Sequence, residues 1–166
     1  MLKTSRLSLR RMSVDDSEFI LTLLNEPSFL RHIGDKGVRT QADACRYIMT
    51  GPVASYERHG FGLLVVELKD TGEPIGMCGL LKRESLSDAD LGFAFLARFW
   101  SKGYAFESAS AVLAWARRAL GLGRILAVVS PDNVASISLL SKLGFRFERT
   151  TRLSEEGPEV RLFASP

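Results

Sequence analysis

The stretch Arg98–Ser108 reads RFWSKGYAFES and joins an apolar run to a helical pattern through a single glycine, Gly103. The run before it, ADLGFAFLA at Ala89–Ala97, has the composition of a strand. After it, apolar residues recur with helical spacing from Ala105 to Leu120. This order predicts a strand that passes through a tight loop into a helix.

Such a loop exposes backbone N–H groups at the start of a helix, where the positive end of the helix dipole also favours an anion. Lys102 adds a mobile positive charge and Arg98 adds a second. A pyrophosphate would suit the place, although neither GxxxxGK[ST] nor GxGxxG is present. Taken alone, the loop favours a plain turn glycine over a phosphate site.

The N-terminal third of the chain predicts one strand and two helices. Residues Arg6–Met12 alternate apolar and polar, as a half-buried strand does. A helix should follow, capped by Asp15 or Asp16 and ended by Pro27, and a second helix should begin at Thr40.

The middle of the chain predicts antiparallel strands before the central helix. Two apolar runs, FGLLVVELK and PIGMCGLLK, are joined by the turn DTGEP and indicate a hairpin. Glu107 lies in the first turn of the following helix, where a carboxylate usually stabilises the dipole.

Beyond the central helix the pattern predicts a strand, a short helix and two last strands. RILAVVS at Arg124–Ser130 is typical of a strand buried on both faces. Asn133 can cap a helix over Val134–Leu143, and the runs FRFER and EVRLFA follow. The expected order is β-α-α-β-β-β-α-β-α-β-β. This is a mixed α/β (α+β) fold with a mostly antiparallel sheet, flanked by helices, in one domain over residues 1–166.

Composition excludes several classes of function. The 166 residues carry a net charge of only +3, with basic residues dispersed among acidic ones, so no nucleic-acid footprint is expected. Cys45 and Cys78 are far apart, which predicts free thiols in a reducing compartment and no metal site. No signal peptide or membrane-spanning run is recognisable, so a cytoplasmic protein is expected.

A second motif changes the interpretation of the loop. Asn133–Phe145 reads NVASISLLSKLGF, and Phe99–Glu107 reads FWSKGYAFE. Together they resemble the GNAT superfamily of N-acetyltransferases, which bind acetyl-coenzyme A. The likeness is closest to the branch with the ribosomal-protein N-terminal alanine acetyltransferases, whose motifs read Y-W-G-K-G-Y-A-x-E and N-x-A-S-x-x-x-L-x-K-x-G-F. Ser101 stands where relatives usually have the first glycine.

The resemblance extends over nearly the whole chain. TSRLSLRRM looks like the family's opening strand, HIGDKGVRTQADA like the segment before its second helix, and GEPIGMCGL like its hairpin. It implies a GNAT-like fold with acetyl-CoA as co-substrate and no metal.

The resemblance also implies roles for residues that would contact the donor. Backbone groups near Phe95 and Leu96 should pair with the pantetheine arm. Asn133 and Ser136 would face the pantetheine and the thioester, and Lys142 could lie near the nucleotide end. A plain helix cap and a solvated charge are the structural alternatives for Asn133 and Lys142. The pyrophosphate should be held by the backbone of the loop that comprises Ser101, Lys102, Gly103, Tyr104 and Ala105, with Arg98 nearby.

The catalytic groups are less clearly marked. Asp90 occupies the place of a glutamate that is often the family's base, so it is either a base acting through a water or an exposed strand-end carboxylate. Many relatives have a tyrosine as the acid where this chain has Leu140, which leaves Ser136 as the nearest candidate. A ping-pong route through a cysteine is not favoured, because neither Cys45 nor Cys78 has a local histidine partner.

The sequence therefore predicts an acetyl-CoA-dependent N-acetyltransferase that acts by direct transfer. The acceptor would be a primary amine, on a small molecule or a protein N-terminus. The alternative is a catalytically weak acyl-CoA sensor or interaction module of the same fold. Binding to RNA through the dispersed basic residues ranks last, and a homodimer is left open.

Overall fold

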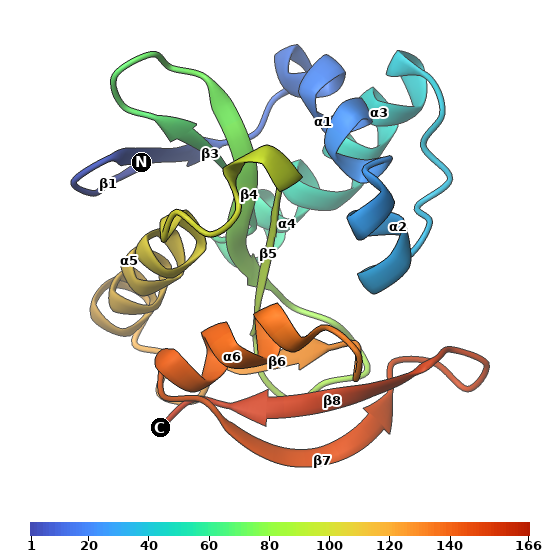
Figure 1. Ribbon diagram of the computed structural model, residues 1–166, viewed down its shortest axis with the longest axis vertical. Coiled ribbons are helices and arrows are strands. Elements are labelled where there is room, and N and C mark those ends of the chain that lie inside the picture. The colour runs from blue at the N-terminus through green and yellow to red at the C-terminus, as the bar shows by residue number, and fades with distance from the viewer.

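The computed structural model describes residues 1–166 and shows one eight-stranded sheet flanked by helices (Figure 1). The strand order is β1-β2-β3-β4-β5-β6-β8-β7, and every neighbouring pair is antiparallel except β5 and β6. The strands are β1 (Leu2–Lys3), β2 (Leu7–Arg11), β3 (Leu63–Leu68), β4 (Pro74–Leu81), β5 (Asp90–Phe95), β6 (Leu126–Val129), β7 (Arg146–Arg152) and β8 (Glu159–Ala164).

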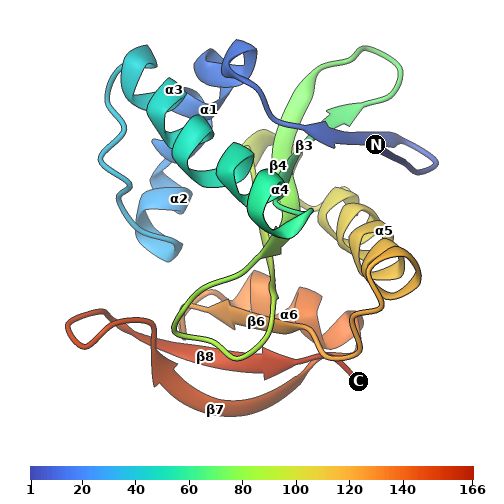
Figure 2. The ribbon, with the colours of Figure 1, turned by 180° about the vertical axis from the view of Figure 1, so that it is seen from behind.

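The helices lie in separate groups on the sheet (Figures 1 and 2). The longest, α5, packs against β1, β2, β4 and β5, while α6 packs against β6. The group α1 to α4 gathers beside the other face of β3 and β4. The helices are α1 (Ser17–Leu24), α2 (Pro27–His32), α3 (Gln41–Ile48), α4 (Ala54–His59), α5 (Tyr104–Ala119) and α6 (Val134–Lys142).

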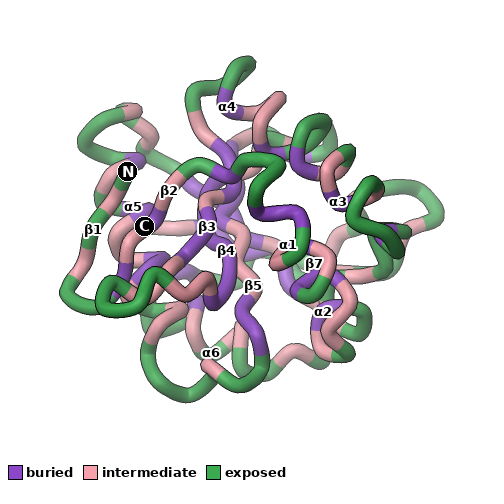
Figure 3. Tube along the Cα trace, turned by 90° about the horizontal axis from the view of Figure 1, so that it is seen from above, coloured by how far each residue is buried: buried purple, intermediate pink, exposed green.

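The alternation of side chains along β3 and β4 explains how one sheet serves two cores. Val65 and Met77 point to the core shared with α1 to α4. Val66 and Cys78, one residue further along each strand, point to the core beneath α5. Both faces of these central strands are therefore buried, and Figure 3 colours most of β4 as buried.

The mixed α/β fold and the parallel β5-α5-β6 crossover confirm the sequence prediction. Three elements were not predicted, namely β1, α2 and α4. Pro27 was expected to end a helix, but α1 already ends at Leu24 and Pro27 begins α2. Proline fits the first turn of a helix because the N–H that it lacks would have no partner there.

The first cap also differs from the prediction. The hydroxyl of Ser13 accepts a hydrogen bond from the Asp15 N–H, and the Asp16 carboxylate accepts from the Ser13 N–H. Neither aspartate therefore caps α1 with its side chain. The expected cap of α3 is present, because Thr40 and Asp43 form a capping box at its start.

Candidate active site

The candidate site begins where β5 and β6 separate. The two parallel strands share one register position, Asp90 opposite Leu126, with the Leu126 N–H donating to the Ala89 carbonyl at 2.9 Å. β5 continues to Phe95 without further pairing to β6. The edge of β5 that faces β6 is therefore open inside the sheet.

The backbone groups of Phe95 and Leu96 differ in their availability. The Leu96 N–H donates to the Ile75 carbonyl at 3.0 Å, and its carbonyl accepts from the Phe99 N–H at 2.9 Å. By alternation, the N–H and carbonyl of Phe95 face the open edge. The Phe95 carbonyl accepts from the Trp100 indole at 2.9 Å, so the Phe95 N–H is the group left for a ligand.

The loop that follows presents a row of unpaired donors. None of the backbone N–H groups from 101 to 106 donates to an acceptor within the chain. The loop reaches this shape through left-handed backbone at Ser101 (φ 61°) and Gly103 (φ 84°). A serine rarely adopts this left-handed conformation, which a glycine would adopt at Ser101 without strain. The donors lie at the N-terminus of α5, which suits an anion.

The loop is braced from the turn between β1 and β2 by a network around Arg6. The Arg6 guanidinium donates to the Lys102 carbonyl at 2.9 Å and to Glu107 at 2.8 Å, and it stacks 4.4 Å above the ring of Tyr104. Burial alone would raise the pKa of Glu107, but hydrogen bonds from Thr4 and Arg6 outweigh it and hold that pKa below its usual value. Glu107 therefore holds the loop in place, which agrees with its predicted role as a stabiliser.

The positive side chains near the loop differ in whether they have an acidic partner. Arg98 forms an ion pair with Glu73 at 2.7 Å, which partly neutralises it. Lys102 is exposed and has no acidic partner. Lys142 is exposed in the last turn of α6, where its charge also favours the helix dipole.

A cavity of about 820 Å³ lies in front of β4 and β5 and extends to α6. Its wall includes Asp90, Asn133 and Ser136, three of the residues that the sequence analysis singled out. The residues of the loop over 98–105 do not line it. The candidate catalytic groups thus share one cavity, and the candidate phosphate site lies outside it.

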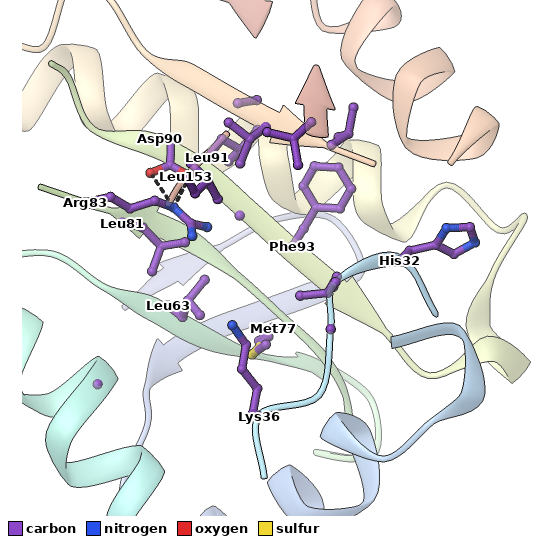
Figure 4. Close-up of a pocket in the computed structure, with 18 of the residues that line it drawn as sticks. His32, Lys36, Leu63, Met77, Leu81, Arg83, Asp90, Leu91, Phe93 and Leu153 are labelled. Atoms are coloured by element: carbon purple, nitrogen blue, oxygen red, sulfur yellow. Dashed lines mark hydrogen bonds and ion pairs between the residues drawn. The ribbon is translucent and has the colours of Figure 1, made fainter. Parts of the chain in front are cut away.

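Asp90 is buried, with 1% of its surface exposed, so it is not the exposed strand-end carboxylate of the alternative interpretation. Arg83, just after the end of β4, places its Nε 3.2 and 3.3 Å from the two carboxylate oxygens (Figure 4). Burial raises the pKa of Asp90, and the charge of Arg83 opposes that rise without cancelling it. A raised pKa moves a carboxylate toward the range in which it can exchange protons at neutral pH.

At the start of α6, Asn133 and Ser136 are joined by a helix cap. The Asn133 side-chain oxygen accepts from the Ser136 N–H at 3.2 Å, so the structural alternative for Asn133 is present. The Ser136 hydroxyl has no partner within the chain and lines the cavity. Leu140 is fully buried in the apolar core, so no polar group faces the cavity from the family's tyrosine position.

The two thiols lie away from the cavity wall. Cys78 is fully buried, and burial raises its pKa to about 12. Such a thiol is not ionised near neutral pH and is a poor nucleophile.

Sequence reasoning missed three further cavity residues. Arg83 follows β4, Lys36 stands on the loop between α2 and α3, and Tyr47 is on α3. No local motif connects these separate segments. The only signal was their residue type, since each has a long side chain that ends in a hydrogen-bond donor.

A family model described as an acetyltransferase (GNAT) domain matches residues 6–146. The chain is 34% identical over 152 residues to the "Uncharacterized N-acetyltransferase YoaA" of Bacillus subtilis (strain 168), covering 91% of this chain and 85% of that protein. No helix of the structure has both the length and the apolar composition needed to cross a membrane.

Solved structures share the fold along nearly the full chain. The acetyltransferase from Agrobacterium tumefaciens str. C58 superposes with a TM-score of 0.84 at 25% identity, covering 99% of this chain and 93% of that one. RimL, a ribosomal L7/L12 alpha-N-protein acetyltransferase in complex with coenzyme A, superposes with a TM-score of 0.81 at 19% identity, covering 97% and 94%.

Proposed function

The chain belongs to the GNAT family of acetyltransferases and is therefore an acyltransferase, and from that premise we propose that it transfers an acetyl group from acetyl-CoA directly to a primary amine. The main support for acetyl-CoA as the acetyl donor is the row of unpaired backbone N–H groups over residues 101–106. These groups, the helix dipole and Lys102 fit a pyrophosphate. The likeness to RimL, which was solved with coenzyme A, supports the same donor.

In this proposal the open edge of β5 binds the rest of the donor. The Phe95 N–H is unpaired and would pair with an amide of the pantetheine arm, much as a neighbouring strand would. The arm would then run from the loop along the gap between β5 and β6 toward the cavity. Asn133 and Ser136 at the start of α6 would face its thioester end.

The reaction is an attack by the acceptor nitrogen on the carbonyl carbon of the thioester. A C–N bond forms, the C–S bond breaks, the nitrogen loses a proton and the thiolate gains one. We assign the first proton transfer to Asp90, directly or through a water, because its carboxylate lines the cavity and its pKa is raised. The Ser136 hydroxyl would orient the thioester or relay a proton to the thiolate.

Direct transfer is preferred over a cysteine intermediate. Neither Cys45 nor Cys78 lines the cavity, and the buried Cys78 thiol has a raised pKa. An α-amine suits a weak base better than a lysine does. At pH 7.4 about a quarter of an α-amine is neutral, against about one in a thousand for a lysine amine.

Release of free CoA thiol from acetyl-CoA tests the proposal. The purified protein is mixed with acetyl-CoA and a panel of amines, amino acids, polyamines and peptides, and the acetylated products are identified by mass spectrometry. We expect amine-dependent thiol release and a product heavier by one acetyl group. Binding of acetyl-CoA without release for any acceptor would contradict the proposal.

A further inference from the structure

The wall of the cavity in front of β4 and β5 carries more basic than acidic side chains. It includes Lys36, Arg58 and Arg83, against the acids Asp90 and Glu159. Other basic side chains of the wall are engaged. Lys82, for example, donates to the carbonyls of Arg83 and Leu86. The lysine and arginine groups of the wall that have no acceptor within the chain are Lys36, Arg58 and the Nη atoms of Arg83.

Arg83 uses only one of its three nitrogens. Its Nε contacts the Asp90 carboxylate, while neither Nη atom has an acceptor within the chain. The Arg83 side chain is 34% exposed and points into the cavity (Figure 4). A guanidinium whose two Nη atoms both carry unused N–H groups is a ready partner for a second, planar anion.

Lys36 projects into the same space from the loop between α2 and α3 (Figure 4). Its amine has no acceptor within the chain. Desolvation lowers the pKa of Lys36, and the charge of Arg83 lowers it further. The charges of Lys36 and Arg83 therefore repel one another, and an anion bound between them would relieve that repulsion.

Tyr47 adds a neutral donor to this group. Tyr47 lines the cavity, and its hydroxyl makes no hydrogen bond within the chain. Burial raises the pKa of Tyr47 to about 12, although the charge of Arg83 opposes the rise. The hydroxyl therefore keeps its proton at neutral pH and can donate it in a hydrogen bond to an anion.

From these contacts we infer that the acceptor carries a carboxylate close to its amine, and that Arg83, Lys36 and Tyr47 bind this carboxylate. The inference rests on the proposed function and names the class of its acceptor. Nε and Nη of a guanidinium are joined through one carbon atom, so a carboxylate on Nη would lie beside Asp90, which is held by Nε. An amine two or three bonds from that carboxylate would then reach Asp90, which attracts it as a cation and can take its proton.

The volume of the cavity agrees with a small acceptor. About 820 Å³ lies within the range of small-molecule sites and must also accommodate the thioester end of the donor. The carboxylate could belong to a free amino acid or to an aspartate at a peptide N-terminus, whose side-chain carboxylate also lies three bonds from the amine. Both sources present the same chemistry to Arg83 and Lys36.

Matched pairs of acceptors test the inference. Alanine is compared with alaninamide, β-alanine with its amide, and the peptide Asp-Ser-Ala-amide with Asn-Ser-Ala-amide, by kcat/KM for thiol release. Each ratio of acid to amide is measured in the wild type and in Lys36→Gln, Arg83→Lys and Tyr47→Phe. Lys3→Gln, the loss of an equal charge from an exposed lysine outside the cavity, is the control. Comparing ratios between variants cancels the different intrinsic reactivity of the amines.

We expect at least one acid to be preferred and its ratio to fall about tenfold in Lys36→Gln, and also in the other two cavity variants. Lys3→Gln should leave the ratio unchanged. A preference limited to the first two pairs identifies a free amino acid, and one limited to the third identifies a peptide. Turnover with equal ratios in the wild type and Lys36→Gln would overturn the inference and leave the proposed function standing. No turnover with any amine would overturn both.

Discussion

The Nε atom of Arg83 lies 3.2 and 3.3 Å from the two carboxylate oxygens of Asp90, a side chain buried inside the sheet. This contact holds a carboxylate at the one point where β5 and β6 still pair. A buried acid whose pKa stays raised beside an arginine lowers stability when ionised. Ionisable residues that lower the stability of the fold in this way are often functional.

Asp90→Asn should separate activity from stability. It should lower kcat/KM by about a hundredfold or more, most strongly at low pH where the acceptor is protonated. The variant should be at least as stable as the wild type at pH 7, because the folded-state pKa is raised and ionisation of Asp90 is unfavourable above it. This gain should disappear as pH falls below the ordinary value of 3.8, where the carboxyl becomes protonated in both the folded and the unfolded state. A pH–rate profile and thermal melts at several pH values measure both effects, and an unchanged profile would remove Asp90 from the mechanism.

Gly103→Val should weaken the affinity for CoA by about tenfold or more, because a side chain would crowd the phosphates at the loop. The positive φ of 84° should also cost about 1 to 2 kcal/mol of stability. Ser101→Gly is the matched control, since Ser101 has a φ of 61° and glycine relieves strain there. Isothermal titration with CoA and thermal melts give the answer, and equal affinity for CoA in both variants would mean that the phosphates bind elsewhere.

Glu107→Gln should loosen the loop through Arg6 without touching the donor. Its carboxylate accepts from Thr4 and Arg6, so we expect a loss of about 1 kcal/mol at neutral pH and a weaker affinity for CoA. The pKa of Glu107 is lowered on folding, so this stabilisation is complete above the ordinary value of 4.5 and is lost as pH falls through the folded-state pKa. Denaturant titrations at pH 7 and at acid pH should show the difference between variant and wild type shrinking. A difference that does not change with pH would refute this account.

Ser136→Ala should lower kcat by about tenfold or more and leave stability unchanged, because the hydroxyl makes no hydrogen bond within the chain. Ser138→Ala, on the same helix with an exposed side chain, controls for helix propensity. Single-turnover rates with saturating acetyl-CoA compare the two. Equal rates in both variants would leave Ser136 as only a residue of the cap.

The sequence predicted the loop because the information for it is local. Ser101, Gly103 and Glu107 are within one contiguous motif, and backbone N–H groups at a helix start need no distant partner. The environment of Asp90 could not be predicted in this way. Its burial and its contact with Arg83 depend on how β4, β5 and β6 pair, and alternation alone does not say which strand end is covered.

The polar groups assigned to the carboxylate of the acceptor could not be predicted from the sequence for the same reason. Lys36 and Tyr47 come from segments between β2 and β3, and only the packing of α2 and α3 brings them opposite Arg83. The Leu96 backbone was likewise assigned to the donor because the sequence does not reveal its hydrogen bonds to Ile75 and Phe99. A local motif can be recognised in a single sequence. The register of strands and the direction of side chains depend on the assembled fold.

The gap between β5 and β6 also bears on solubility. Unpaired strand edges usually lie at the rim of a sheet, where they invite strands of other molecules and promote aggregation. Here the unpaired edge is flanked on one side by β4 and on the other by β6, β8 and β7. A strand of another molecule cannot pair with this edge of β5 unless the flanking strands separate. The backbone groups of β5 can therefore stay available to a narrow ligand without presenting an aggregation-prone strand edge to other protein molecules.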